Sequence, residues 1–349
     1  MIIKRIEVEN FWGKYYIKWD LDNSVNILTG INGAGKSTLF DLISSIIIGG
    51  KTPKFLVTKS SRVKIEFDDG STLVNINFND SYLALQRQAK DNEVLNELKE
   101  DIDSDFNSTS RKTRLNSIML NASISFVENK DKEKIPISRF LNQLNVDIIS
   151  TFDEPLTIIE EKSKWESLKE DGVRSSLDNE LHNLQEQYSF YIGDLASRIE
   201  QIIMSGNNPS IESLTKLYAT KNLFIETINE LFKSTGKVID INNSKLSFKI
   251  VEDNIPISIY ELSSGEKQML YILWKVLIQD QKPYIIFLDE PEISLHVDWQ
   301  EVLISKIKLL NPNCQIVLAT HAPTVVLDGW QPFVQYLDDL KVLVDNNGK

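Results

Sequence analysis

Three short apolar runs mark this chain as an α/β protein. They cover 25–29, 284–288 and 315–319, and none of them alternates with polar residues. Continuous runs of this kind are typical of strands that are buried on both faces, and such strands are usually parallel. Because helical patterns separate the runs, the sequence predicts a parallel sheet within an α/β fold.

Alternating patterns nearer the N-terminus predict a second, antiparallel part. Residues 1–30 read as short strands, and 63–67 and 73–78 alternate apolar and polar positions around a turn of Asp, Asp, Gly and Ser. Such a pattern indicates a hairpin with one face in water. A further strand is expected at 83–85.

The middle of the chain has a helical pattern over 156–204. Its apolar residues keep a spacing of three or four, and the stripe consists of Leu177, Leu181, Leu184, Tyr188, Tyr191, Leu195, Ile199 and Ile202. The stripe fits two arrangements equally, the seam of a helical hairpin or short coiled coil and a helix packed on the domain core. A second helix is expected near 211–232, packed back on the first.

An acidic stretch followed by Ser, Thr and basic residues fills 88–114. This composition favours a solvated insertion. The basic cluster at 111–114 is alternatively a contact for nucleic acid or for a partner, although a solvated loop is the favoured interpretation.

Composition narrows the class of protein. The 349 residues carry a net charge of −12, which argues against a surface that is basic all over and binds nucleic acid or membranes non-specifically. One cysteine, Cys314, excludes an intrachain disulfide, and its place beside an apolar run predicts a buried thiol. Since no apolar run has the length of a signal core or a membrane span, we expect a cytoplasmic protein with no membrane partner.

The first apolar run ends in Gly-Ile-Asn-Gly-Ala-Gly-Lys-Ser, at 30–37, and a helical pattern follows over 36–48. Strand, glycine-rich loop and helix are the context of a phosphate-binding P-loop. Lys36 is predicted to reach the β- and γ-phosphates of a nucleotide, and Ser37 to hold Mg²⁺. The nucleotide-binding residues predicted here are Asn32, Gly33, Ala34, Gly35, Lys36, Ser37 and Thr38.

The second apolar run ends in Asp289 and Glu290, which is the Walker B pattern. Asp289 is expected to hold Mg²⁺ through water, and Glu290 to act as the general base that polarises the attacking water.

Upstream of it, Leu-Ser-Ser-Gly-Glu at 262–266 resembles the Leu-Ser-Gly-Gly-Gln signature of ABC-type ATPases. Glu266 in place of glutamine is similar to SMC-like and DNA-repair members. In that family the signature contacts the γ-phosphate held by the other subunit. The resemblance therefore implies that Ser263 and Gly265 bind ATP in a head-to-tail dimer.

Residues 290–300 sharpen the resemblance. His296 stands where transporter ATPases carry aspartate. The short motifs Glu-Pro-Glu, Leu-His and Trp-Gln in this segment resemble those of OLD-type ATPases of the AAA-15 and AAA-21 group. That group includes ATPase subunits of phage-defence systems such as Septu, PARIS and some retrons. His321 resembles the switch histidine, which is implied to bind the γ-phosphate. Asn-Phe-Trp at 10–12 resembles an SMC-like element whose surroundings contact nucleotide, although core packing is equally consistent.

The resemblance implies an ABC-ATPase P-loop fold with an N-terminal antiparallel β subdomain and a helical insertion. We expect a first ATPase lobe at 1–87, an insertion at 88–250 and a second lobe at 251–349. The family's Q-loop glutamine is left open among Gln86, Gln88 and Gln143.

The function implied is a Mg²⁺-dependent ATPase, with Lys36, Glu290 and His321 in catalysis, that dimerises on ATP and regulates an effector in phage defence. Only 28 residues follow His321, so the effector is expected to be a separate protein such as a nuclease. The alternatives are a DNA-repair or chromosome-associated ATPase and, with less support, a transporter energiser. The sequence leaves open whether the protein also binds a nucleic acid.

Overall fold

The computed structural model describes residues 1–50, 52–78, 122–150, 172–205, 210–240 and 245–344. The chain forms two compact units. The first comprises Met1–Ile148, Gln315–His321 and Phe333–Lys349, and the second Ile149–Cys314 and Ala322–Pro332. Strand β8 (Val146–Ser150) crosses from one to the other in sequence. The predicted lobes at 1–87, 88–250 and 251–349 remain a prediction.

Parallel strands form the inner layer of the first unit. β3 (Val25–Thr29) pairs in parallel with β13 (Gln315–Ala319) and with β14 (Val334–Tyr336), so that Ile27 lies opposite both Leu318 and Val334. All five residues of β13 are buried. The apolar runs at 25–29 and 315–319 are therefore buried parallel strands, as their composition predicts.

An antiparallel sheet forms the outer layer of the first unit. Its order is β15-β2-β1-β4-β5-β6-β7. The strands are β1 (Ile3–Phe11), β2 (Tyr15–Asp20), β4 (Arg62–Phe67), β5 (Thr72–Phe78), β6 (Ala122–Glu128), β7 (Lys134–Ile135) and β15 (Lys341–Leu343). The predicted hairpin is β4 and β5, with Ile65 opposite Leu73. The strand expected at 83–85 lies outside the described residues.

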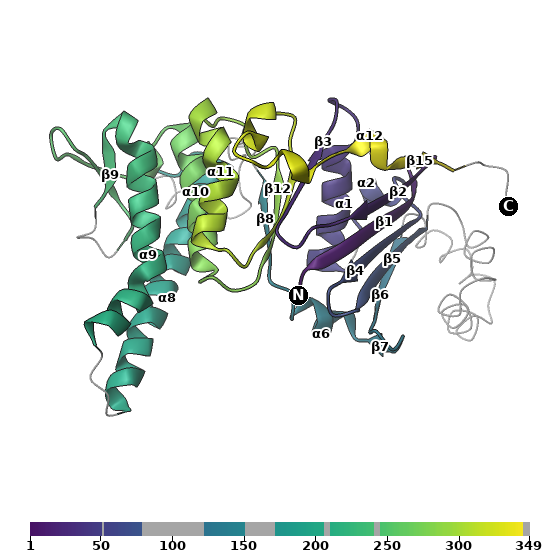
Figure 1. Cartoon of the computed structure of the whole chain (residues 1–349), viewed down its shortest axis with the longest axis horizontal. Coiled ribbons are helices and arrows are strands. Elements are labelled where there is room, and N and C mark those ends of the chain that lie inside the picture. Colours follow the sequence, from purple (N-terminus) through teal and green to yellow (C-terminus); the bar gives the residue numbers. More distant parts are fainter. Residues whose placement is uncertain (51, 79–121, 151–171, 206–209, 241–244, 345–349) are drawn as a thin grey trace, which may run out of the picture. The chain divides into compact units, whose positions relative to one another are not determined.

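Helix α1 (Lys36–Gly49) lies between these layers (Figure 1). Phe40 packs on Trp19 of β2 with ring centroids 6.4 Å apart, while α1 also contacts β13. The side-chain amide of the fully buried Gln315 accepts from the backbone N of Ile3 and donates to its carbonyl, at 2.8 and 2.7 Å. The described residues of the unit also form the short helices α2 (Lys54–Val57), α6 (Ile137–Leu141) and α12 (Leu337–Leu340).

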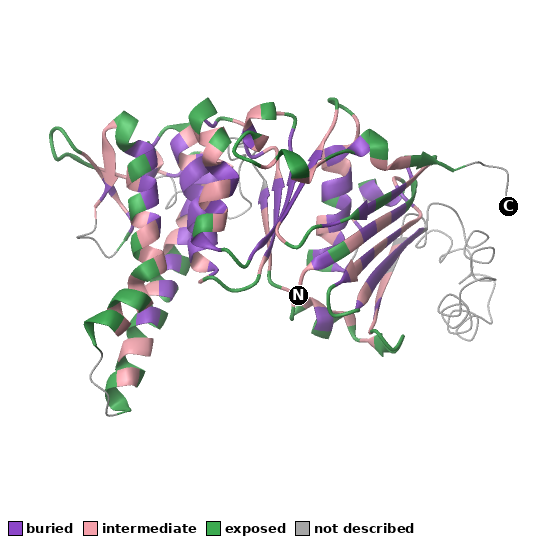
Figure 2. Ribbon diagram, viewed as in Figure 1, coloured by how far each residue is buried: buried purple, intermediate pink, exposed green. Residues whose placement is uncertain are grey.

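The second unit is built around α10 (Ser264–Ile278), which contacts three other helices. These are α8 (Ser176–Met204), α9 (Ile211–Leu231) and α11 (Val297–Leu310). Figure 2 shows α10 and the strand β12 (Ile285–Asp289) as largely buried. A small antiparallel sheet has the order β11 (Pro256–Ile257), β10 (Phe248–Ile250), β9 (Lys237–Ile239). None of the described helices has both the length and the apolar character to cross a membrane.

The long helix begins later than its pattern predicts. Ser175 caps α8 in a capping box with Asp178, so that 172–175 precede the helix, while 156–171 lie outside the described residues. Its apolar stripe packs on α10, where Tyr188 meets Trp274 edge to face at 5.7 Å. Both arrangements are therefore observed, because α8 packs on α10 and also contacts α9, with which it forms a helical hairpin (Figure 1). The second helix is confirmed as α9.

Candidate functional site

The predicted P-loop connects β3 to α1. Gly33 and Gly35 have φ angles of 81° and 102°, in the left-handed region that favours glycine. No side chain caps the first turn of α1, so its backbone N–H groups are available to an anion. The loop thus has the backbone shape and the donors that a phosphate needs.

Aromatic rings press against one wall of this loop. A Cβ placed on Gly35 would lie 2.8 Å from Nε1 of Trp12 and 3.2 Å from the ring of Phe11. Phe11 is buried, and Trp12 is partly exposed with the ammonium of Lys59 over its ring at 4.3 Å. The Asn-Phe-Trp element therefore adjoins the P-loop, and its predicted contact with nucleotide remains a proposal.

Lys36 is a buried cation held by carbonyl oxygens. Its side chain lies in the core at 5% exposure, and Nζ donates to the carbonyls of Gly30 at 2.9 Å and Ile31 at 3.4 Å. Within the described part of the chain, no carboxylate forms an ion pair with it. A buried ammonium without a counter-ion favours an anionic ligand strongly. The residues present therefore fit a bound phosphate chain.

His321 leaves the strand next to the P-loop strand. The backbone N of Thr320 donates to the carbonyl of Leu28 at 3.0 Å, which fixes the end of β13 beside the end of β3. His321 follows directly and is exposed. Because the carboxyl ends of parallel strands meet at one edge of a sheet, the structure brings the predicted switch histidine and the P-loop to the same edge.

The Walker B residues belong to the second unit. Four buried residues, 285–288, precede Asp289 and Glu290, both of which are half-buried. Glu290 has a φ of 47°, in a region that non-glycine residues rarely adopt. Such strain is concentrated at functional sites, where the surrounding structure enforces it.

The signature motif forms the N-terminus of α10. Ser263 is the N-cap: its hydroxyl accepts from the backbone N of Glu266, whose carboxylate accepts from the backbone N of Ser263 at 2.8 Å. Glu266 is 1% exposed and also accepts from Lys237 at 2.6 Å and from Thr235 at 2.7 Å. Burial raises the pKa of Glu266, but the hydrogen bonds from Lys237, Thr235 and Ser263 outweigh it and bring the pKa below its usual value.

Gly265 packs against the loop that follows the Walker B residues. A Cβ on Gly265 would lie 2.4 Å from the carbonyl oxygen of Ser294. No side chain fits there without a shift of backbone, so glycine is required at this position of the signature for a steric reason.

His296 is the N-cap of α11, where its imidazole accepts from the backbone N of Asp298 at 3.4 Å. In the preceding loop, Glu292 is buried and accepts from the backbone N of Ala322 at 3.3 Å. Gln300 donates to the carbonyls of Leu295 and Glu292. These contacts hold the loop after Glu290 in one conformation.

The predicted site residues are thus divided between the units. The first contains the P-loop, Trp12 and His321, and the second contains the signature, the Walker B pair and His296. Of the Q-loop candidates, Gln86 and Gln88 lie outside the described residues, as does the basic cluster at 111–114, while Gln143 is exposed after α6.

Two charged contacts around the signature could not be predicted from the sequence. Lys237 pairs with Glu266, and Lys267 of α10 pairs with the buried Asp178 of α8 at 2.7 Å. The Ser-x-x-Glu spacing indicates the capping box. The charged partners of Glu266 and Lys267, however, lie 29 or more residues away from them in the chain, and no local sequence pattern connects the members of either pair.

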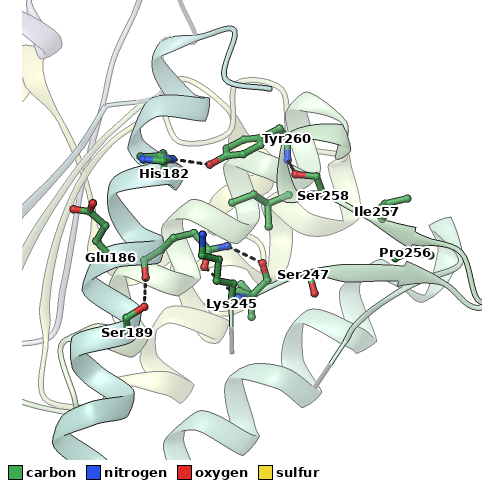
Figure 3. Close-up of a pocket in the computed structure, with 12 residues that line it drawn as sticks. His182, Glu186, Ser189, Lys245, Ser247, Pro256, Ile257, Ser258 and Tyr260 are labelled. Carbon is green, nitrogen blue, oxygen red and sulfur yellow. Dashed lines mark hydrogen bonds between the residues drawn. The ribbon is translucent and has the colours of Figure 1, made fainter. Parts of the chain in front are cut away.

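A cavity of about 480 Å³ lies in the second unit between α8 and the segment that leads to the signature. Figure 3 shows His182 at its wall, where Nδ1 lies 3.0 Å from the hydroxyl of Tyr260. His182 lies on a face of α8. The buried thiol predicted for Cys314 is also confirmed, since its Sγ donates to the carbonyl of Asn311 and burial raises its pKa to about 11.

Known proteins resemble this chain over most of its length. The "Retron Vc95 probable ATPase" of Vibrio cholerae is 24% identical, with 91% of this chain and 70% of that protein covered. The "Septu protein PtuA" of Bacillus thuringiensis is 22% identical, with 93% and 73% covered. Among solved structures, the SMC head bound to the C-winged helix domain of ScpA is 15% identical, with a TM-score of 0.49, and covers 99% of this chain and 97% of that one.

A family model described as "AAA domain, putative AbiEii toxin, Type IV TA system" matches residues 25–328. The match runs from the P-loop strand through the signature, the Walker B residues and His321. The chain therefore belongs to this AAA-21 family, as an ATPase of the AAA type related to retron and Septu proteins.

Proposed function

We propose that this protein binds ATP at the P-loop and hydrolyses it, and that the ATP cycle controls a separate effector in phage defence. The observation that carries the first part is Lys36, a buried ammonium at the start of α1 that, among the described residues, donates to two carbonyls of its own loop. The glycine-rich backbone around it supplies the remaining phosphate donors.

In the proposed reaction Lys36 and the loop amides hold the β- and γ-phosphates and stabilise the charge that develops during in-line attack of water. Glu290 accepts a proton from that water as general base. Mg²⁺, when held by Ser37 and Asp289, supplies neutralising charge to the phosphates. His321 donates to the γ-phosphate and senses its loss.

The signature is proposed to complete the site of a second subunit. Ser263 begins α10, so its hydroxyl and the following N–H groups form a helix N-terminus of the kind that binds anions. A head-to-tail dimer would place this terminus at the γ-phosphate of the partner subunit, so that each ATP lies between two copies.

Regulation of an effector is supported by relatives among retron and Septu proteins. The effector is expected to be a nuclease or another toxin encoded next to this chain. Cells carrying the chain with its neighbouring genes should resist phage, and Lys36→Ala should remove that resistance. Cleavage of DNA by the purified chain alone would contradict a separate effector.

The direct test is ATP binding by Lys36→Ala. This change removes the buried cation, so titration calorimetry with MgATP should detect no binding at concentrations where the wild type saturates. Arg198→Ala removes a surface cation of the second unit that pairs with Asp280 and should bind ATP as the wild type does. Tight ATP binding by Lys36→Ala would refute the assignment of the P-loop.

A further inference from the structure

The segment that follows β14 lies along the outside of the P-loop. Figure 1 shows α12, in yellow, near the carboxyl end of β3, while β15, which follows it, pairs with β2. Leu337 of α12 is fully buried, and a Cβ on Gly30 would lie 3.8 Å from its Cβ. The first glycine of the loop therefore rests on residues more than 300 positions later in the sequence.

Lys341 makes a second and more specific contact. Its Nζ donates to the carbonyl oxygen of Ala34 at 2.8 Å, in the middle of the P-loop. The side chain is only 11% exposed, pairs with Asp338 at 2.9 Å and lies over the ring of Tyr15 at 5.4 Å. These partners hold the ammonium in place from three sides.

The contact bears on phosphate binding through the geometry of one peptide bond. The carbonyl of Ala34 and the N–H of Gly35 belong to the same planar trans peptide, so they point in opposite directions. Fixing the carbonyl on Lys341 outside the loop therefore fixes the N–H of Gly35 toward the inside. The glycines on either side of Ala34 would otherwise leave this peptide free to rotate.

We infer that Lys341 is a positioning residue for nucleotide binding, because it presets the Gly35 N–H for a phosphate oxygen. This inference rests on the proposed ATP function. It adds to that function a residue that lies more than 300 positions after the loop in the sequence. Its charge also favours an anion nearby, in part offset by Asp338.

The test compares Lys341→Met with Lys341→Arg. Methionine keeps the apolar stem and loses the donor, so the Kd for MgATP in calorimetry and the KM should rise about tenfold, while kcat at saturating ATP changes less than about twofold, because binding is lost equally from ground and transition states. Arginine retains a charged donor and should bind within about twofold of the wild type.

Lys306→Met is the matched control, because Lys306 is 18% exposed, pairs with Glu230 at 2.7 Å and belongs to the second unit, whereas the P-loop belongs to the first. It should leave the Kd unchanged. The inference is overturned if Lys341→Met binds ATP like the wild type, or if Lys341→Arg is impaired as strongly as Lys341→Met. Failure of the proposed function would appear instead as unchanged ATP binding by Lys36→Ala.

Discussion

Glu266 stands where the signature of transporter ATPases has glutamine, and its surroundings give a reason for the carboxylate. The side chain is buried and accepts from the backbone N of Ser263, from Thr235 and from Lys237. Glutamine would keep the length of the side chain but would leave the ammonium of Lys237 without its anion. At the scale of single residues, the start of α10 is thus held by a charge-assisted network.

We therefore expect Glu266→Gln to destabilise the protein near neutral pH by about 1–3 kcal/mol, because a half-buried lysine loses its partner. The pKa of Glu266 is lowered in the folded state. Its contribution to stability is therefore present above the unfolded pKa and is lost as the pH falls through the folded pKa. Urea unfolding of both proteins should show a constant difference from about pH 7 to about pH 5, and a difference that shrinks from there to about pH 3.5.

Lys237→Met is the control, since it removes the same ion pair from the other side. In a double-mutant cycle the two changes should not add. A stability difference for Glu266→Gln that stays the same down to the acid end of the range would contradict the role assigned to the carboxylate.

At the scale of elements, α10 connects the signature to the rest of the second unit. Its N-terminus is tied to α8 by Lys267 and Asp178, and its first turn touches the loop after Walker B at Gly265 and Ser294. Close packing of this kind transmits small displacements because well-packed interfaces do not deform continuously. The contact between Gly265 and Ser294 is the tightest of these and is the one that a substitution can test.

Gly265→Ala should lower the free energy of unfolding by about 1–3 kcal/mol, because its Cβ would overlap the carbonyl of Ser294 and force a backbone shift. Gly193→Ala in α8 is the matched control. A Cβ there meets no atom within 4 Å, so the change should stabilise the helix by about 0.5–1 kcal/mol. Thermal unfolding measures both. Equal effects of the two substitutions would show that the contact with Ser294 does not limit the position.

At the scale of the whole molecule, the two units carry different parts of the proposed chemistry. The P-loop and His321 belong to one unit, and the signature and Glu290 to the other. The proposed dimer requires the signature of one copy at the ATP of the other. Formation of the dimer should therefore depend on bound ATP and on whether that ATP has been hydrolysed.

Glu290→Gln removes the general base and should hold uncleaved ATP, so sedimentation should show a dimer with MgATP and a monomer with MgADP. The control adds Ser263→Asp to this variant. Aspartate still caps a helix, but its charge repels a γ-phosphate, and the ATP-dependent dimer should disappear. A dimer that forms equally with and without ATP, or that persists in the double variant, would contradict the sandwich arrangement.

The sequence by itself determined the local elements and predicted where phosphate binds. Hydrophobic period and turn residues predicted the strands at 25–29 and 315–319, the hairpin at 62–78 and the helices α1 and α9, because these signals act over a few neighbouring positions. The P-loop could be identified for the same reason, since loop, lysine and helix start are contiguous.

The tertiary structure alone decided what meets across long separations. It packed α8 on both α10 and α9, gave Glu266 its partner Lys237, and placed Lys341 on the carbonyl of Ala34. In the sequence, no local pattern distinguishes Lys237 and Lys341 from lysines that are exposed to solvent. Their roles arise when folding brings a distant backbone oxygen or carboxylate within reach and removes the competing water.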